Sequence, residues 1–310
     1  MRARPGLGTR GRQRGAAVIL ALLVMTLGVL LVSGAFLRQS VMVVQVENDA
    51  AGAQARWLLT GAIDWVRAVL REDGRSTLVD HAGEPWAVPL DLTRVEGGRG
   101  EAAWVSGRVE DAQARFNLRN LTGPSGPVTA EVAVLARLLD VVGLDGAGAG
   151  ALAQRLQVAM LAQRDRGVAL QPATVDALVL PEAADRMALE RLAPFVTLLP
   201  IPTSVNLNTA AAEVIAARFA NLSLADARRI VTDRERGWFR DPEELQRRRP
   251  GLVVLGDPGR LAVNSRFFLL RGVVEVGRAR VAGQALLRRD GDRVDVLWMS
   301  DDALLPERRA

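Results

Sequence analysis

Residues 16–37 read AAVILALLVMTLGVLLVSGAFL, a run of 22 residues without a charged side chain. A helix rises about 1.5 Å per residue, so this run is long enough to cross about 30 Å of hydrocarbon. The apolar run of a cleaved signal peptide is usually shorter, about 7–15 residues, although Ser33-Gly34-Ala35 offers a small-residue cleavage motif. The run therefore predicts either a membrane-spanning anchor or a long signal peptide, and its surroundings have to distinguish the two.

The helical pattern continues beyond the apolar run. A mostly apolar stripe recurs at spacings of three and four residues, which is typical of an amphipathic helix. Its members are Val41, Val44, Asn48, Ala51, Ala55, Leu58, Ala62, Trp65 and Val69. No proline occurs between Ala16 and Arg71, so we predict one helix of about 84 Å over 16–71. Its upper half is expected to pack through this stripe on the globular part, and its lower half to lie in lipid or among neighbouring helices.

The basic residues at the N-terminus predict the orientation of this helix. Five arginines lie within residues 1–14, whereas the first acidic residue is Glu47. Without these five, the chain is formally neutral, because 35 arginines face 35 acidic residues. A basic tail beside an apolar segment follows the positive-inside rule. The sequence pI of about 11.0 reflects the absence of lysine, tyrosine and cysteine, and we expect no nucleic-acid partner from it.

The composition excludes several kinds of chemistry. The chain has no cysteine, which excludes disulfides, metal–thiolate sites and thiol catalysis. Its single histidine, His81, leaves little general-base chemistry near neutral pH. With Asp80 and Glu84 it is too sparse for a catalytic site, and we interpret it as a surface histidine in a loop. No catalytic residue is assigned; a tethered enzyme would have to work with carboxylates alone. The six tryptophans are interpreted as core or interface anchors.

Two strand-rich stretches flank a helix-rich one. Strand patterns occur at 86–92, 102–111, 113–118, 266–276, 278–288 and 293–299. Helical patterns occur at 129–142, 147–164, 172–179, 182–192, 209–219, 223–236 and 241–248. We therefore predict an α+β fold, in which the long N-terminal helix packs on an antiparallel sheet that is interrupted by a large, mostly helical inserted domain. The expected divisions are a leader (1–15), a spine helix (16–72), a first sheet part (73–121), the insert (122–261) and a second sheet part (262–310).

Five short stretches spread along the chain resemble one family. They are Arg12-Gln13-Arg14-Gly15 before the apolar run, Gln54-Ala55-Arg56-Trp57, Asp111-Ala112-Gln113-Ala114-Arg115-Phe116-Asn117-Leu118, Ser204-Val205-Asn206-Leu207-Asn208-Thr209-Ala210, and Arg266-Phe267-Phe268-Leu269. In this order they resemble the K-type minor pseudopilins of bacterial type II secretion systems (general secretion pathway protein K). The resemblance implies a pilin-like sheet beneath the spine helix. The chain length also fits, because other pseudopilins lack a large helical insert.

The resemblance implies a processing site and one telling position. A prepilin peptidase would cut after Gly15 and methylate Ala16 as the new N-terminus. In ordinary pilins the fifth residue after the cut is Glu, whereas here it is Leu20. A carboxylate among apolar helices costs about 2.5–3.5 kcal/mol unless it is paired, and the proposed partner is the N-terminal ammonium of the preceding subunit. A subunit that enters first has no predecessor, so Leu20 fits the tip; it also fits an ordinary anchor.

A non-enzymatic tip subunit follows from this resemblance. Such a subunit would start or cap the pseudopilus, and its bulky insert at 122–261 would prevent repeated stacking in a thin fibre. The implied partners are the I- and J-type minor pseudopilins, the prepilin peptidase and the inner-membrane assembly platform. The implied location is the bacterial inner membrane, with a single pass and a periplasmic C-terminal domain.

A DNA-binding function is the main alternative. Residues 206–250 open with Val205-Asn206-Leu207-Asn208-Thr209-Ala210 and resemble a helix-hairpin-helix module, which would suit a membrane-tethered DNA-uptake protein. Such modules present backbone N–H groups from a glycine-rich hairpin to phosphate, but the connection here, Ala220-Asn221-Leu222-Ser223, has no glycine. We expect instead that Asn208 or Thr209 caps the first helix, and that Ser223 caps the second with Asp226 at the N3 position.

The last strands carry a cluster of acidic residues. Asp290-Gly291-Asp292 is expected to form a β-turn, and Asp295, Asp301 and Asp302 follow it. Their oxygens are possible Ca²⁺ ligands, and the alternative is a turn followed by a solvated tail. No ligand set is assigned from the spacing.

Overall fold

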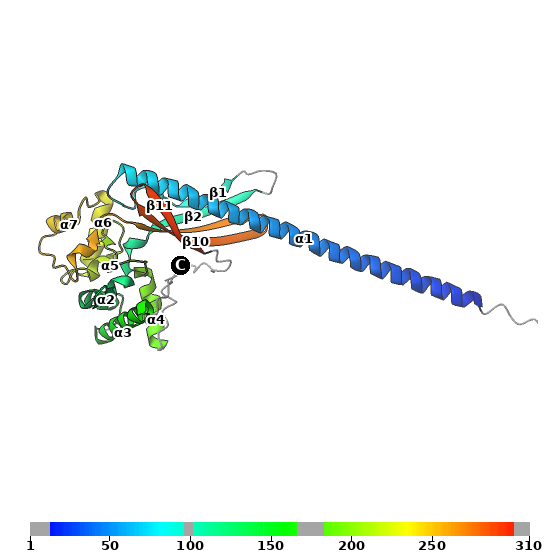
Figure 1. Cartoon of the computed structure of the whole chain (residues 1–310), viewed down its shortest axis with the longest axis horizontal. Coiled ribbons are helices and arrows are strands. Elements are labelled where there is room, and N and C mark those ends of the chain that lie inside the picture. Colours follow the sequence, from blue (N-terminus) through cyan, green and yellow to red (C-terminus); the bar gives the residue numbers. More distant parts are fainter. Residues whose placement is uncertain (1–12, 96–101, 145, 166–182, 301–310) are drawn as a thin grey trace, which may run out of the picture.

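The computed structural model describes residues 13–95, 102–144, 146–165 and 183–300 (Figure 1). Helix α1 (Gln13–Ser76) runs without interruption for 64 residues, about 96 Å. Met25 and Trp65 lie in this one element, so the predicted single spine helix is confirmed. In Figure 1 its N-terminal half extends away from the rest of the molecule, while its C-terminal half lies along a sheet.

The sheet beneath α1 has five antiparallel strands in the order β1-β2-β9-β10-β11. The strands are β1 (Leu90–Val95), β2 (Ala103–Asp111), β9 (Phe267–Val276), β10 (Ala279–Asp290) and β11 (Arg293–Ser300). Adjacent strands β2 and β9 pair from Ala103↔Val276 to Asp111↔Phe268, although more than 150 residues separate Asp111 from Phe267 in the sequence. The two strand-rich stretches therefore form one sheet, as predicted, and the helical part leaves and re-enters between neighbouring strands.

Two predicted strands are mostly absent. The stretch at 86–92 begins as a 3₁₀ turn, η1 (Pro85–Ala87), and becomes a strand only at Leu90. The stretch at 113–118 contains the 3₁₀ turns η2 (Ala112–Ala114) and η3 (Leu118–Leu121), which flank the short strand β3 (Phe116–Asn117). Proline cannot donate a ladder hydrogen bond, and the side chain of Asp111 accepts from the backbone N–H of Gln113, which stabilises a turn where the apolar pattern predicts a strand.

Helix α1 faces the sheet with a different stripe from the one predicted. The buried α1 side chains with apolar contacts to the sheet are Ala55, Leu59, Ile63, Val66 and Leu70. At 3.6 residues per turn, the predicted positions Leu58, Ala62, Trp65 and Val69 lie about a quarter turn to one side, and Trp65 is 57% exposed. Packing of the upper half on the sheet is therefore confirmed, but the predicted contact face is wrong.

A row of glycines accounts for the rotation of α1. Gly107, Gly272 and Gly283 lie side by side on β2, β9 and β10. A Cβ on Gly272 would lie 3.5 Å from the Leu59 side chain, and one on Gly283 would collide with it. Leu59 therefore sits in the space left by missing side chains, which draws its face of the helix onto the sheet. The apolar pattern of α1 contains no information about these glycines, so it could not predict the rotation.

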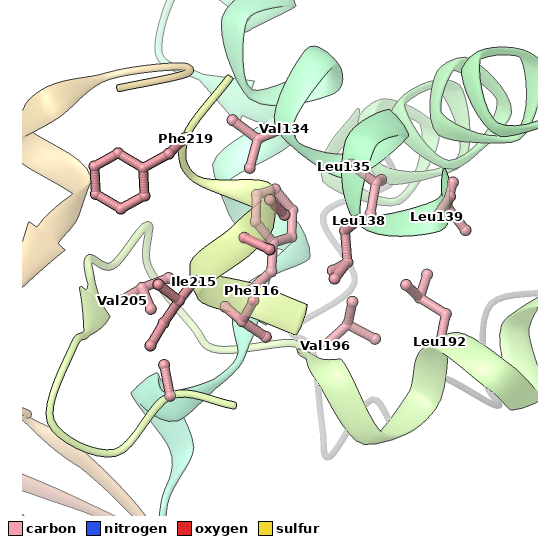
Figure 2. Close-up of a cluster of buried hydrophobic side chains, with 14 of the residues drawn as sticks. Phe116, Val134, Leu135, Leu138, Leu139, Leu192, Val196, Val205, Ile215 and Phe219 are labelled. Atoms are coloured by element: carbon pink, nitrogen blue, oxygen red, sulfur yellow. The ribbon is translucent and has the colours of Figure 1, made fainter. Parts of the chain in front are cut away.

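The helical part forms its own core. It contains α2 (Thr129–Val141), α3 (Gly146–Asp165), α4 (Ala183–Leu192), α5 (Ala212–Ala217), α6 (Leu224–Arg236) and α7 (Pro242–Arg248). These match the predicted helices within three residues at each end, while the predicted helix at 172–179 lies outside the described residues. Figure 2 shows side chains of α2, α4 and α5 meeting around Phe116. Short two-stranded pairings tie the connecting segments: β3 with β6 (Val196–Thr197), β4 (Thr122–Gly123) with β5 (Gly126–Pro127), and β7 (Val205–Asn206) with β8 (Leu261–Ala262).

The capping predictions are half right. Ser223 Oγ accepts from the backbone N–H of Asp226 at 3.1 Å and caps α6, as predicted. Helix α5 begins only at Ala212 and has Ala211 at its N-cap without a side-chain hydrogen bond. The expected caps, Asn208 and Thr209, bond to distant parts of the chain instead, because their positions bring them to buried polar partners.

Candidate functional site

The N-terminal half of α1 presents an apolar surface that no other described residue covers. Ala17–Phe36 is a 20-residue window of mean hydropathy 2.6 with no buried side chain. Soluble proteins rarely expose contiguous apolar patches of this size, and the length suits a bilayer. Thr26, a polar residue in this window, donates its hydroxyl to the carbonyl oxygens of Leu22 and Leu23. This segment is the single candidate span in the described part of the chain, and it is consistent with single-pass anchoring.

The predicted site residues lie at the start of this surface. Gly15 and Ala16 belong to the first turn of α1. Leu20 follows one turn later with 66% of its surface exposed. Because no acidic residue lies in the first turn and the first along the chain is Glu47, the exposed apolar segment is free of negative charge throughout.

A buried polar network lies at the opposite end of α1. Arg289 on β10 donates to Asp73 Oδ2 at 2.8 Å and to Asp80 Oδ2 at 2.6 Å. Its guanidinium also lies over the ring of Phe268, 4.9 Å from the centroid. One arginine thus joins the last turns of the spine helix, the loop that follows it and the sheet.

Asp111 connects the same region to the helical part. Its Oδ2 accepts hydrogen bonds from Asn206 Nδ2 at 2.9 Å, Ser265 Oγ at 2.6 Å and Thr209 Oγ1 at 2.5 Å. Asn206 Nδ2 also donates to the backbone carbonyl of Asp80 at 3.1 Å. The end of β2, the segment before β9 and the opening of the helix-hairpin-like region therefore meet at one carboxylate.

Sequence reasoning missed this network, although parts of it lie in stretches that it singled out. Asp111 and Asn206 belong to two stretches that carry the family resemblance, and Ser265 directly precedes a third. Polar residues that recur inside otherwise apolar stretches are the signal that points to buried hydrogen bonding. Their convergence on one site depends on the pairing of β2 with β9, which the sequence does not specify.

His81 is not the free surface histidine that we predicted. Its ring stacks on Trp238, with centroids 4.0 Å apart, and its Nδ1 accepts from the backbone N–H of Gly83. The neighbouring Glu84 is buried and accepts from Trp86 Nε1 at 2.8 Å and from the backbone N–H of His81 at 2.9 Å. Contacts between the loop and the α6–α7 connection, far away in sequence, explain why the local pattern was misread.

The carboxylates of this network are electrostatically strained. Oxygens of Asp73, Asp80 and Glu84 lie within 4.8 Å of one another, and Arg289 is the cation that contacts this group. Burial, with the nearby charge of Glu84, raises the pKa of Asp73 to about 6, against the opposing effect of Arg289. Burial also raises the pKa of Asp80 and of Asp111. The folded chain therefore binds protons more tightly here than the unfolded chain does.

The raised pKa of Asp73 gives an expected pH dependence. Stability from this group is fully present below its unfolded pKa of about 3.9 and is lost as the pH rises through its folded pKa of about 6. We expect Asp73→Asn to flatten the decline in thermal stability between about pH 5 and 7.5, by on the order of 1–3 kcal/mol. Melting curves of the detergent-solubilised chain measure this. Asp64→Asn on the exposed side of α1 is the control, and an unchanged slope for Asp73→Asn would contradict the expectation.

The acidic residues considered as Ca²⁺ ligands do not converge. Asp292 pairs with Arg75 at 3.2 Å, Asp290 with Arg266 at 3.3 Å and Asp295 with Arg293 at 2.7 Å. The other two candidates, Asp301 and Asp302, lie outside the described residues. Gly291, with φ 58°, forms the expected turn between β10 and β11. The described members thus act as partners of arginine on separate sides of this turn.

The connection between α5 and α6 is closed by another segment. The backbone N–H of Ala220 donates to the carbonyl of Val253 at 2.8 Å, and the backbone N–H of Val253 donates to Asn221 Oδ1 at 2.9 Å. Asn221 Nδ2 also donates to the carbonyl of Gly251 at 2.7 Å. Backbone groups that a phosphate-binding hairpin keeps free are therefore used inside the chain.

Comparisons with known proteins agree with this architecture. The model of the family "Type II secretion system (T2SS), protein K" matches residues 205–262. Type II secretion system protein K of Pseudomonas aeruginosa is 29% identical over 91% of each chain. The protein K of Klebsiella pneumoniae is 28% identical over 94% of this chain and 99% of its own, and that of Pectobacterium carotovorum is 26% identical over 93% and 96%.

A solved structure shares the fold. One chain of the crystal structure of the GspK–GspI–GspJ complex from the type 2 secretion system of enterotoxigenic Escherichia coli superposes with a TM-score of 0.64 and 22% identity, covering 81% of this chain and 96% of that one. The class is thus an α+β protein with a long apolar N-terminal helix packed on a pilin-like antiparallel sheet. Within that class, the chain belongs to the protein K family of type II secretion systems.

Proposed function

We propose that this chain is a non-enzymatic minor pseudopilin that occupies the tip of the type II secretion pseudopilus and starts or caps its assembly. The observation that carries this proposal is a fully exposed apolar helix without negative charge before Glu47. The helix is rigidly continuous with a spine whose far end bears a large helical part. Such a chain is built to enter a helix bundle from below and to present bulk above it.

The position of the helical part supports a terminal place in the fibre. In Figure 1 it lies beyond the C-terminal end of α1 and to one side of the helix axis. The network around Asp111 and Arg289 fixes it to the end of the sheet and of the spine. A subunit stacked directly above would meet this bulk, whereas the lower end of the spine remains free to contact later subunits. We keep the division at 73–121, 122–261 and 262–310 as part of this proposal.

Processing and partners complete the proposal. A prepilin peptidase removes residues 1–15 and methylates Ala16, and the inner-membrane assembly platform receives the mature chain. The similar solved structure contains GspI and GspJ beside GspK, which supports I- and J-type minor pseudopilins as neighbours here. The chain then sits in the inner membrane by a single pass with its C-terminal domain in the periplasm.

The mass of the mature protein tests the processing step. A chain that begins at N-methylated Ala16 is the expected result of intact-mass and N-terminal peptide measurements. A mature chain that begins near Phe36 would show conventional removal of a signal peptide. That outcome would overturn the pseudopilin assignment, because no apolar spine would remain.

Leu20→Glu tests the place at the tip. With no preceding subunit to supply an ammonium group, the new carboxylate remains unpaired among apolar helices at a cost of about 2.5–3.5 kcal/mol. We expect strongly reduced co-purification with the I- and J-type subunits and reduced secretion by the system. Leu20→Ala is the control and should behave like the native chain. Native behaviour of Leu20→Glu, at equal protein level in the membrane, would contradict a first-in-assembly role.

A further inference from the structure

Helix α1 carries a second apolar stripe beside the one that its own sheet covers. The stripe consists of Val41, Val44, Asn48, Ala51, Ala55, Leu58, Ala62, Trp65 and Val69, and we call it the seam. Among its described side chains only Ala55 is buried, and Trp65 is 57% exposed. The sheet therefore leaves most of this stripe without a covering element, although it is as regular as the buried one.

The spacing of the seam identifies the kind of element that fits it. Its members alternate strictly between steps of three and four over 29 residues, which is an average period of about 3.5 residues, the period of a coiled-coil seam. If Val41 is assigned to the a position, Asn48 also falls on an a position and Trp65 on a d position. A single Asn at an a position is a known determinant of register between paired helices. A sheet or a loop would not require this period, so the pattern points to a helix.

An apolar groove runs along the same flank of α1. Its walls include Ala62, Trp65 and Val69 from the seam, and Val88, Leu90, Val105 and Val109 from the sheet side. Val88 is 65% exposed. Its floor includes Gly107 and Gly272, which belong to the glycine row and hold the sheet surface low. A helix lying against the seam would also cover these apolar side chains.

We propose that a parallel amphipathic helix of a neighbouring pilin-like subunit packs along the seam of α1 and over the adjoining groove. This inference rests on the proposed function, because it assigns a surface to the neighbours that the function requires. Parallel orientation follows because both helices enter the same membrane from the same side. Two copies of this chain in register would place two bulky helical parts at the same level (Figure 1), whereas a subunit without such an insert meets no such obstacle.

Cysteine cross-linking tests the seam directly, because the native chain has no cysteine. The full chain is co-expressed with the I-type minor pseudopilin of the same system, which carries single cysteines along its own spine helix. We expect Leu58→Cys and Ala62→Cys to form disulfides with this partner. Ala53→Cys should not, since Ala53 lies nine residues from Ala62, and about 2.5 turns place it on the opposite side of α1. The J-type subunit is tested in the same way.

A charge test uses the same matched pair of alanines. Ala62→Glu places an unpaired carboxylate in the seam and is expected to reduce partner co-purification at least tenfold. Ala53→Glu, the same substitution on the exposed opposite face, should leave it unchanged. Equal melting temperatures of the two variants show that folding is intact. If Ala62→Glu misfolds, the cysteine variants alone decide.

The outcomes separate the seam from the proposed function. If the native chain fails to co-purify with either minor pseudopilin, the proposed function falls. If it co-purifies but Ala62→Cys cross-links no better than Ala53→Cys, the seam alone is wrong. A disulfide between two copies of this chain through Leu58→Cys or Ala62→Cys would also overturn the proposal, because the occupant would then be a second copy. Cross-links confined to the seam, with a helix period on the partner, are the supporting result.

Discussion

Glu131→Ala is expected to lower the free energy of unfolding by about 3–5 kcal/mol, since it leaves a buried guanidinium without its counter-charge. Arg218 on the C-terminal side of α5 is 0% exposed and donates through Nη1 to Glu131 Oε1 and Oε2, at 2.9 Å and 3.0 Å. Burial already lowers the pKa of Arg218. Urea unfolding followed by circular dichroism measures the loss.

The surroundings of this pair make relaxation difficult. The guanidinium of Arg218 lies over the ring of Phe116, 5.4 Å from the centroid, at the centre of the core in Figure 2. Gly256, with φ +81°, packs so closely that a Cβ would meet the side chains of Val134 and Glu131. Water therefore has little room to replace the lost carboxylate.

Two further variants separate charge from packing in this core. The double variant with Glu131→Met and Arg218→Met removes both charges and is expected to recover most of the loss, because apolar pairs of similar size replace buried ion pairs at little cost. Glu213→Ala is the single-site control; its carboxylate faces Arg228 at 3.9 Å near the surface, where such pairs contribute less than about 1 kcal/mol. An effect of Glu131→Ala no larger than that of Glu213→Ala would contradict this account.

Asp111→Ala is expected to lower the free energy of unfolding by about 2–4 kcal/mol. The substitution leaves the donors on Asn206, Ser265 and Thr209 unsatisfied in a buried place, together with the backbone N–H of Gln113, which is 2.7 Å from Asp111 Oδ1. Removal of a desolvated carboxylate offsets part of this loss. Because these donors come from the helical part and from the segment before β9, we also expect the helical part to be held less firmly on the sheet.

A double-mutant cycle isolates the contribution of this network. Asp111→Ala, Asn206→Ala and the double variant should show a coupling free energy of about 0.5–3 kcal/mol. Asp64→Ala, which removes an exposed carboxylate from α1, is the control and should change stability by less than about 1 kcal/mol. Strict additivity of Asp111→Ala and Asn206→Ala would show that the hydrogen bond between them contributes nothing.

The spine and the helices were predictable because their signals are local. The uncharged run at 16–37, the absence of proline to Arg71 and the apolar periodicity specify α1 without any tertiary contact. The capping box of Ser223 and Asp226 likewise marks the start of α6 from a few adjacent residues. Alternating residues and the turn at Gly291 similarly predicted β10 and β11, although not their neighbours.

Local patterns failed where partners distant in sequence compete for the same groups. Asn208 was expected to cap α5, but it exchanges hydrogen bonds with the backbone of Phe239, at 2.9 Å and 2.8 Å. His81 was expected at the surface, but Trp238 covers its ring. Nothing within a few residues of either position indicates these contacts.

The sequence by itself determined that this chain carries one long, apolar-ended helix, an α+β head and no negative charge at the fifth position after Gly15, because those properties depend on residue type and spacing alone. The tertiary structure decided which stripe of α1 meets the sheet, and thereby which stripe is left for a partner. It also decided that Asp111, Asn206, Arg289 and Asp80 share one network. The physical reason is that strand pairing across more than 150 residues sets both the row of glycines under Leu59 and the meeting of these polar groups.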